Sequence, residues 1–196
     1  ITIMEKLNCI SPIDGRYSKY TSALSKFFSE AGLIRFRIMI ELGYFKAIIH
    51  KTQIQTHEIL DITKLNSEMQ TFLNEEINDD NIQQIKNIES EINHDVKAVE
   101  IYIKNILLET ELKECVSFIH FGLTSQDINN VLYPVLIKNF IKDEYENLLD
   151  NITNKLDTMY NEYNNVIMLG HTHGQAAVPT TFGKELAVFC ARSDRQ

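Results

Sequence analysis

Two histidines stand in a glycine-flanked segment, Gly170-His171-Thr172-His173-Gly174-Gln175. An imidazole exchanges protons near neutral pH, so a histidine presented by such a loop is suited to general acid–base catalysis. Zinc requires three or four ligands, and no cysteine or acidic residue lies at a typical spacing from this pair. No metal site is therefore expected. On spacing alone, a general acid at His173 and a loop histidine without a role both stay open.

Another histidine lies in Asn93-His94-Asp95, at the start of a helix that the apolar spacing predicts over Val96–Leu108. The N-terminus of a helix attracts anions through its backbone N–H groups and favours a neutral imidazole over imidazolium. Asn93 or Asp95 is the expected helix cap. A histidine that only caps the helix is the equally weighted alternative.

The segment Gly122–Asn130 combines a helix-start signal with hydroxyl groups. Thr124 and Asp127 resemble a capping box, with Asp in place of the usual Glu or Gln. The Thr124-Ser125 pair, followed by a long helix with unpaired N–H groups in its first turn, also makes a carboxylate-binding site. Capping does not exclude this second role.

The segment Ser11–Tyr17 contains the turn signal Asp14-Gly15, and Pro12 stiffens its entry. The planar guanidinium of Arg16 is suited to gripping a phosphate or a carboxylate. A plain surface loop is the alternative on this pattern alone.

Helical periodicity dominates the elements that must position these residues. It predicts a long amphipathic helix from Ile128 to Tyr163, which cannot bury its apolar stripe alone and belongs in a bundle or oligomer. Pro134 is expected to kink or interrupt this helix. Strand-like alternation is limited to one short extended piece at Asn165–Leu169. Shorter helices are expected over Ser29–Lys51, Ile62–Ile77, Asn81–Ser90 and Lys184–Gln196.

These elements predict an all-α fold with a boundary near Thr110–Lys113. Residues 1–112 would form a small helical N-terminal domain. Residues 113–196 would form the first part of a central domain of long bundled helices. The chain starts at Ile1 and stops within a helix-like segment, so a fragment of a longer protein is expected.

Composition excludes several classes of function. Asp and Glu number 27 against 19 Lys and Arg, a net charge of −8 that argues against a general nucleic-acid-binding surface. The most apolar stretch, Phe36–Ile49, is interrupted by Arg37, Glu41 and Lys46, so no membrane span is expected. The N-terminus lacks a signal-peptide pattern. Three distant cysteines fit thiols in a reducing compartment, which predicts a cytoplasmic protein.

Four segments together resemble the adenylosuccinate lyase family of the fumarase/aspartase superfamily. They are SPIDGRY at 11–17, NHDVKAVE at 93–100, FIHFGLTSQDINN at 118–130 and THGQ at 172–175. Their order and spacing also fit, and the resemblance covers the chain as the N-terminal part, under half, of such an enzyme. It implies a helical homotetramer in which central helices of four subunits form a bundle and each active site takes residues from three subunits.

The resemblance implies a carbon–nitrogen lyase of purine nucleotide biosynthesis that needs no cofactor. Its small-molecule substrates would be adenylosuccinate, cleaved to fumarate and AMP, and the succinyl-aminoimidazole-carboxamide ribotide. A base removes the proton beta to the departing nitrogen, and an acid protonates that nitrogen as the C–N bond breaks. Another lyase of the superfamily and a non-catalytic helical oligomerisation module are the alternatives.

The resemblance also implies roles for individual residues. His173 matches the general acid, and His94 matches a second active-site histidine that helps to hold the substrate. The serine base of the family lies in a loop expected beyond Gln196, so this chain alone is predicted to be inactive. The matching substrate-binding positions are Arg16 and Tyr17 for the nucleotide, Thr124 and Ser125 for a carboxylate, and Asn93 and Asp95 flanking the site.

Overall fold

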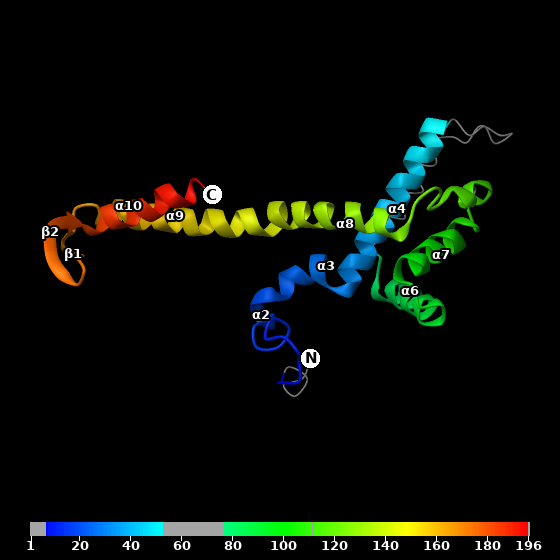
Figure 1. The fold of residues 1–196 in the computed structure, drawn as a ribbon, viewed down its shortest axis with the longest axis horizontal. Coiled ribbons are helices and arrows are strands. Elements are labelled where there is room, and N and C mark those ends of the chain that lie inside the picture. The colour runs from blue at the N-terminus through cyan, green and yellow to red at the C-terminus, as the bar shows by residue number, and fades with distance from the viewer. Residues whose placement is uncertain (1–6, 53–76, 111, 196) are drawn as a thin grey trace. The chain divides into compact units, whose positions relative to one another are not determined.

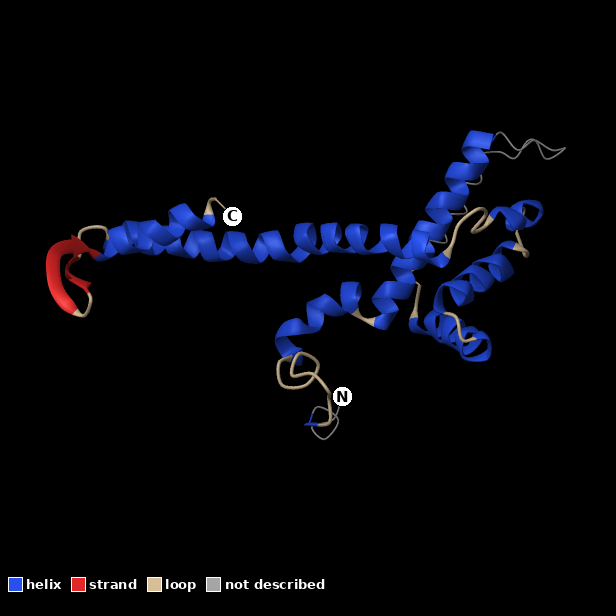
Figure 2. Cartoon of the chain, viewed as in Figure 1, coloured by secondary structure: helices blue, strands red, loops and turns tan. Residues whose placement is uncertain are grey.

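The computed structural model describes residues 7–52, 77–110 and 112–195, and helices predominate among them (Figures 1 and 2). The chain divides into two compact units, Ile1–Lys138 and Asn139–Gln196. The domain boundary predicted at residues 112 and 113 stays a prediction.

The first unit is helical throughout its regular elements, as the periodicity predicts. Helices α4, α6 and α7 confirm the predictions over Ser29–Lys51, Asn81–Ser90 and Val96–Leu108, while the helix predicted over Ile62–Ile77 lies outside the described residues. The elements are α2 (Ser18–Thr21), the 3₁₀ turn η1 (Ser22–Leu24), α3 (Ser25–Phe28), α4 (Glu30–Thr52), α6 (Asp79–Ile92), α7 (Asp95–Leu107), the 3₁₀ segment η2 (Lys113–Phe118) and the start of α8 (Ser125–Phe140).

Two residues join α6 to α7, and both have special backbone geometry. Asn93 ends α6 in the left-handed conformation, with φ of 54°, and its N–H donates to the carbonyl of Glu89 at 2.7 Å. Asparagine tolerates this conformation better than most residues. His94 then turns extended and becomes the N-cap of α7. The cap is therefore the histidine, which confirms the alternative of a capping histidine, and neither Asn93 nor Asp95 is the N-cap.

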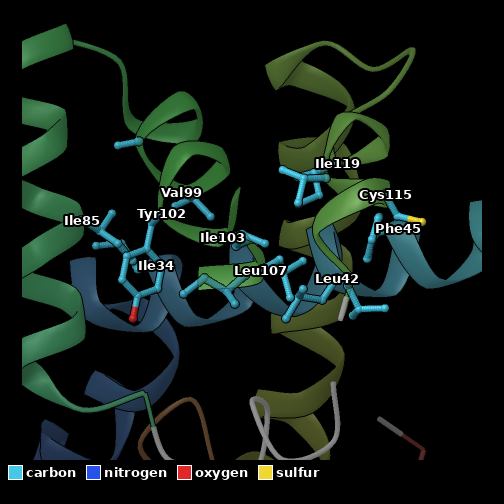
Figure 3. Close-up of a cluster of buried hydrophobic side chains, with 14 of the residues drawn as sticks. Ile34, Leu42, Phe45, Ile85, Val99, Tyr102, Ile103, Leu107, Cys115 and Ile119 are labelled. Carbon is cyan, nitrogen blue, oxygen red and sulfur yellow. The ribbon is translucent and has the colours of Figure 1, made fainter. Parts of the chain in front are cut away.

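The core of the first unit lies where α4, α6, α7 and η2 meet (Figure 3). One face of α4 supplies apolar side chains at helical spacing, and α6 and α7 supply partners such as Ile85, Val99 and Ile103. Burying each side chain of this size contributes about 1.5–3 kcal/mol. The buried face of α4 consists of Ile34, Ile38, Leu42, Phe45 and Ile49.

Among the described residues of this unit, three charged side chains are buried: Arg37 and Glu41 of α4, and Glu100 of α7. Glu100 accepts hydrogen bonds from Lys97 at 2.8 Å and from Lys104 at 2.6 Å. Burial raises the pKa of the Glu100 carboxyl, but the two ammonium groups outweigh burial and leave the pKa below its ordinary value. Arg37 and Glu41 contact the segments that the sequence singled out.

The predicted helix from Ile128 to Tyr163 is present as successive helical segments. α8 continues through Pro134, so the predicted interruption does not occur there. A π-helical turn follows at Ile141–Tyr145, and α9 runs over Glu146–Tyr163. Every residue of α9 lies at least partly exposed within this chain.

The second unit also contains an antiparallel hairpin of β1 (Ile167–Thr172) and β2 (Gln175–Thr181), drawn red in Figure 2. The sequence predicted one extended piece at most, because Gly170, Gly174 and Pro179 interrupt the alternation. α10 (Phe182–Ser193) returns along α9. Gly183 permits this packing, since a Cβ atom there would lie 2.5 Å from the Cα of Asn164. The helical class is confirmed, with this hairpin added.

No described helix is both long enough and apolar enough to cross a membrane.

Candidate functional site

The starts of α7 and α8 come together in the first unit through His94 and Ser125. The Nδ1 atom of His94 accepts a hydrogen bond from the N–H of Lys97 at 3.1 Å, so the neutral ring carries its proton on Nε2. Nε2 lies 3.3 Å from the Oγ of Ser125. Two predicted site residues, 31 positions apart in sequence, thus meet at a half-exposed surface.

Thr124 and Asp127 form one half of the predicted capping box. The N–H and the hydroxyl of Thr124 both donate to Oδ2 of Asp127, at 2.8 and 2.9 Å. These two bonds lower the pKa of the Asp127 carboxyl. The Thr124 hydroxyl is therefore engaged by its own helix start, whereas the Ser125 hydroxyl faces His94. The arrangement presents a serine hydroxyl and an imidazole N–H at a helix N-terminus, which suits a carboxylate.

Asp95 is engaged on both carboxylate oxygens. Oδ1 accepts from the N–H of Val96 at 2.8 Å, and Oδ2 lies 2.6 Å from Nη2 of Arg37. Its contacts serve the start of α7, next to His94. Asn93, the other residue predicted to flank the site, is exposed and ends α6.

Sequence reasoning missed the support that α4 gives to these segments. Arg37 reaches Asp95 and also lies 3.5 Å from Oδ1 of Asn129 in α8. One turn later, Glu41 lies 2.6 Å from Nδ1 of His120, just before the Thr124-Ser125 pair. The signal was in the sequence: Arg37 and Glu41 are charges in its most apolar stretch.

The buried Glu41–His120 pair holds the loop that precedes α8. Burial raises the pKa of the Glu41 carboxyl, and the hydrogen bond with His120 opposes that shift. His120 has a left-handed backbone, with φ of 61°, and the hydroxyl of Tyr44 donates to the carbonyl of Phe121 at 2.9 Å. α4 thus fixes this loop at two successive residues.

Arg16 and Tyr17 lie together on a turn, as the Asp14-Gly15 signal predicts. The N–H of Tyr17 donates to the carbonyl of Pro12 at 2.9 Å, and the guanidinium of Arg16 lies 5.6 Å from the centre of the Tyr17 ring. Both side chains are exposed. Their assignment to the nucleotide part of a substrate stays a prediction.

His173 occupies the tip of the hairpin in the second unit. Thr172 pairs with Gln175, and the two residues between them have positive φ, 50° at His173 and 75° at Gly174. Two such residues make the tight turn that matches the twist of paired strands. The loop predicted around His173 is therefore a two-residue β-turn that presents an exposed imidazole.

Among the described residues, no group of three or more His, Cys, Asp or Glu side chains is arranged to hold a metal ion.

Comparison with known proteins shows which family the chain belongs to. The model of the family described as "Lyase" matches residues 15–196. The chain belongs to this lyase family. The match includes His94, Ser125 and His173, whose surroundings are described above.

Several curated relatives of this chain are named adenylosuccinate lyase. The adenylosuccinate lyase of Legionella pneumophila (strain Corby) is 42% identical over 193 residues, which are 96% of this chain and 41% of the relative. Those of Buchnera aphidicola subsp. Acyrthosiphon pisum (strain APS) and Escherichia coli (strain K12) are 41% and 35% identical, over 98% of this chain and 42% of each relative. The chain thus spans about two fifths of the relatives it matches.

Solved structures share the fold at lower identity. The fumarate lyase from Mesorhizobium sp. BNC1 aligns with a TM-score of 0.69 and 17% identity, over 89% of this chain and 38% of that protein. The β-carboxy-cis,cis-muconate cycloisomerase from Acinetobacter calcoaceticus sp. ADP1 aligns with a TM-score of 0.68, also at 17% identity, with the same coverage. At this identity the likeness establishes the fold.

Proposed function

We propose that the protein to which this chain belongs is an adenylosuccinate lyase. It would eliminate fumarate from adenylosuccinate to give AMP, and from the succinyl-aminoimidazole-carboxamide ribotide earlier in purine synthesis. The observation that carries the proposal is the set of curated relatives of that name, 35–42% identical over nearly the whole chain. They span more than twice its length, so the proposal concerns the complete enzyme.

In the proposed reaction, His173 is the general acid that protonates the departing amino nitrogen. Its exposed position on a tight turn supports this role, because a proton donor must reach a substrate held by other elements. The serine base is expected beyond Gln196. General acids of this kind contribute about 10²–10⁴ in rate.

In the same proposal, His94 and Ser125 hold a carboxylate of the succinyl group. The Nε2–H of His94 and the Ser125 hydroxyl lie 3.3 Å apart at a helix N-terminus, and that combination attracts a carboxylate. Thr124 would contribute less than Ser125, because its hydroxyl already donates to Asp127.

We further propose a homotetramer located in the cytoplasm. Large apolar side chains stay exposed along the second unit, and exposed apolar surface of this kind is typical of subunit interfaces. Buried thiols at Cys115 and Cys190 fit a reducing compartment. The exposed residues include Ile141, Tyr145, Leu148, Ile152, Val188 and Phe189.

The test follows adenylosuccinate absorbance and fumarate release by the full-length protein. His173→Ala should lower kcat by about 10²–10⁴ while fold and AMP binding are retained. His171→Ala, two residues away on the same hairpin, is the matched control and should retain most of the activity.

Two results would contradict the proposal. A folded, full-length protein without turnover of either nucleotide would point to another succinyl substrate or to a non-catalytic helical module. Equal loss in the His171 and His173 variants would remove His173 as the specific acid.

A further inference from the structure

The guanidinium of Arg37 lies between the starts of two helices that carry candidate site residues. Its Nη2 atom lies 2.6 Å from Oδ2 of Asp95, the first residue of α7, and 3.5 Å from Oδ1 of Asn129, in the first turns of α8. We infer that Arg37 is a positioning residue that sets the contact between His94 and Ser125. This inference rests on the proposed function only for its effect on activity.

Arg37 is connected to His94 through Asp95 and to Ser125 through Asn129. Asp95 follows His94 directly, and its Oδ1 atom also accepts the N–H of Val96 in the first turn of α7. Asn129 lies four residues after Ser125, on the same face of α8. One rigid, planar group therefore holds both helix starts at the separation that lets Nε2 of His94 reach Ser125.

The burial of Arg37 points to placement as its main role. The side chain is 6% exposed, and its Nε atom has no hydrogen-bond partner among the described residues. A buried cation with an unsatisfied donor costs desolvation energy, so such ion pairs often add little net stability. An apolar residue would fill the same space in α4 without that cost. What the guanidinium adds is a fixed geometry between α7 and α8.

Arg37 also offsets the charge of Asp95 beside the imidazole. Oδ1 of Asp95 lies 3.8 Å from Nδ1 of His94. With Arg37 in place, the carboxylate is paired, and Nδ1 keeps its bond with the N–H of Lys97. Without Arg37, the unpaired Asp95 carboxylate favours the tautomer with its proton on Nδ1, which cannot accept the N–H of Lys97, so the ring loses its single orientation.

The experiment uses the full-length protein with Arg37→Met and Arg37→Lys. Both contacts of Arg37 come from Nη2, and lysine keeps the charge on a shorter, more flexible side chain, so it should weaken both contacts without removing the charge. Arg35→Met is the matched control, because Arg35 lies on the same helix and bonds the carbonyl of Ile77 and the carboxylate of Asp79 in α6. A displacement of about 1 Å at a site costs up to about 10²-fold in rate.

The first measurement is independent of any substrate. Hydrogen–deuterium exchange of the first-turn amides of α7 and α8 should be faster in Arg37→Met than in the wild type. It should be intermediate in Arg37→Lys and unchanged in Arg35→Met. Wild-type exchange at both helix starts in Arg37→Met would overturn the inference, even if the proposed function holds. If Arg37→Met does not fold, Arg37→Lys alone carries the test.

The second measurement is a double-mutant cycle on kcat/KM with His94→Gln. Arg37→Met alone should lower kcat/KM by about 10–100-fold, with most of the loss in KM. In the His94→Gln background the same change should cost less than about threefold, because the residue it positions is already gone. Additive losses would overturn the inference. A wild type inactive on adenylosuccinate would refute the proposed function, while the exchange measurement still decides the role of Arg37.

Discussion

The two compact units hold their candidate histidines in different ways. In the first unit, His94 is fixed by a backbone N–H, by Ser125 and, through Asp95, by a buried arginine. In the second unit, His173 is placed by the backbone of a two-residue turn, and its side chain is exposed. One histidine is held by packed elements of its own unit, the other is presented outward.

The same contrast appears in the apolar side chains. α4 and α7 bury theirs within the first unit, where Leu42 is 1% exposed. α9 buries none of its residues within the chain, and Leu148 is 59% exposed. The packed core of the first unit can fix the position of a side chain such as His94. The second unit leaves its apolar side chains exposed, so it needs further contacts to fix His173 equally well.

The largest expected effect on stability distinguishes the buried apolar face of α4 from the exposed apolar face of α9. In the full-length protein, Leu42→Ala should lower the free energy of unfolding by about 2–5 kcal/mol, because it leaves a cavity in a closed core. The loss should not depend on protein concentration. In the proposed homotetramer, Leu148→Ala should act on assembly, so its destabilisation should grow with protein concentration until both proteins are fully assembled. Urea unfolding at two concentrations measures both, and a concentration-independent loss for Leu148→Ala would contradict the comparison.

The next effect tests a close contact between α9 and α10 in the second unit. Gly183→Ala should destabilise α10 against α9 by about 1–3 kcal/mol, because the new Cβ would lie 2.5 Å from the Cα of Asn164. Gly43→Ala in α4, where a Cβ meets nothing within 4 Å, is the control and should stabilise by about 0.4–1 kcal/mol. Thermal unfolding compares them, and a neutral Gly183 variant would show that α10 does not need this close approach.

A third prediction concerns the pH dependence of stability at two buried carboxylates of the first unit, Glu100 and Glu41. The pKa of Glu100 is lowered in the folded protein, so its contribution is present above its ordinary pKa of 4.5 and is lost as the pH falls below that value. Glu100→Gln should therefore cost about 1.5 kcal/mol at pH 7 and progressively less in acid.

Glu41 is the control, because its contribution to stability should change with pH in the opposite direction. Its pKa is raised, so its contribution is present below the ordinary value of 4.5 and is lost as the pH rises through the folded pKa. The penalty of Glu41→Gln should accordingly shrink as the pH rises. Denaturant unfolding from pH 3 to pH 7 measures both slopes, and equal slopes would contradict the assigned directions.

The smallest expected effect is the loss of a helix N-cap, which should destabilise the two units by similar amounts. Asn78 caps α6 by accepting the N–H of Asn81 at 3.0 Å, and Thr181 caps α10 by accepting the N–H of Lys184 at 3.2 Å. Replacing either residue by Ala should cost about 1 kcal/mol. Amide exchange in the first turn of each helix measures the loss. A much larger loss at Thr181 would show that α10 depends on its cap more than α6 does.

The helices could be predicted because their signal is local. Apolar spacing located α4, α6 and α7, and the extended helical stretch through α8 and α9. The hairpin could not be predicted, because its strands are short and interrupted by Gly170 and Pro179. In the sequence, the only sign of its turn was a histidine next to a glycine.

The candidate site was predictable only in part. His94, Ser125 and His173 stand in short segments whose residue types suggest chemistry and whose order resembles a family. The support from α4 joins residues far apart in sequence, such as Glu41 and His120, which are separated by 79 positions. No spacing rule connects such pairs. Their only local sign was that Arg37 and Glu41 are charges on an apolar helix face.

The hairpin that carries His173 has a consequence for the time course of folding. Its strands are joined by two residues, so their pairing closes a short loop, an event that takes about 1–10 μs. An isolated two-stranded hairpin is only marginally stable in water. During refolding, the imidazole should therefore be presented repeatedly before it is held in place. In the homotetramer proposed for the full-length protein, catalytic activity should then appear later than helix content, at a rate that increases with protein concentration.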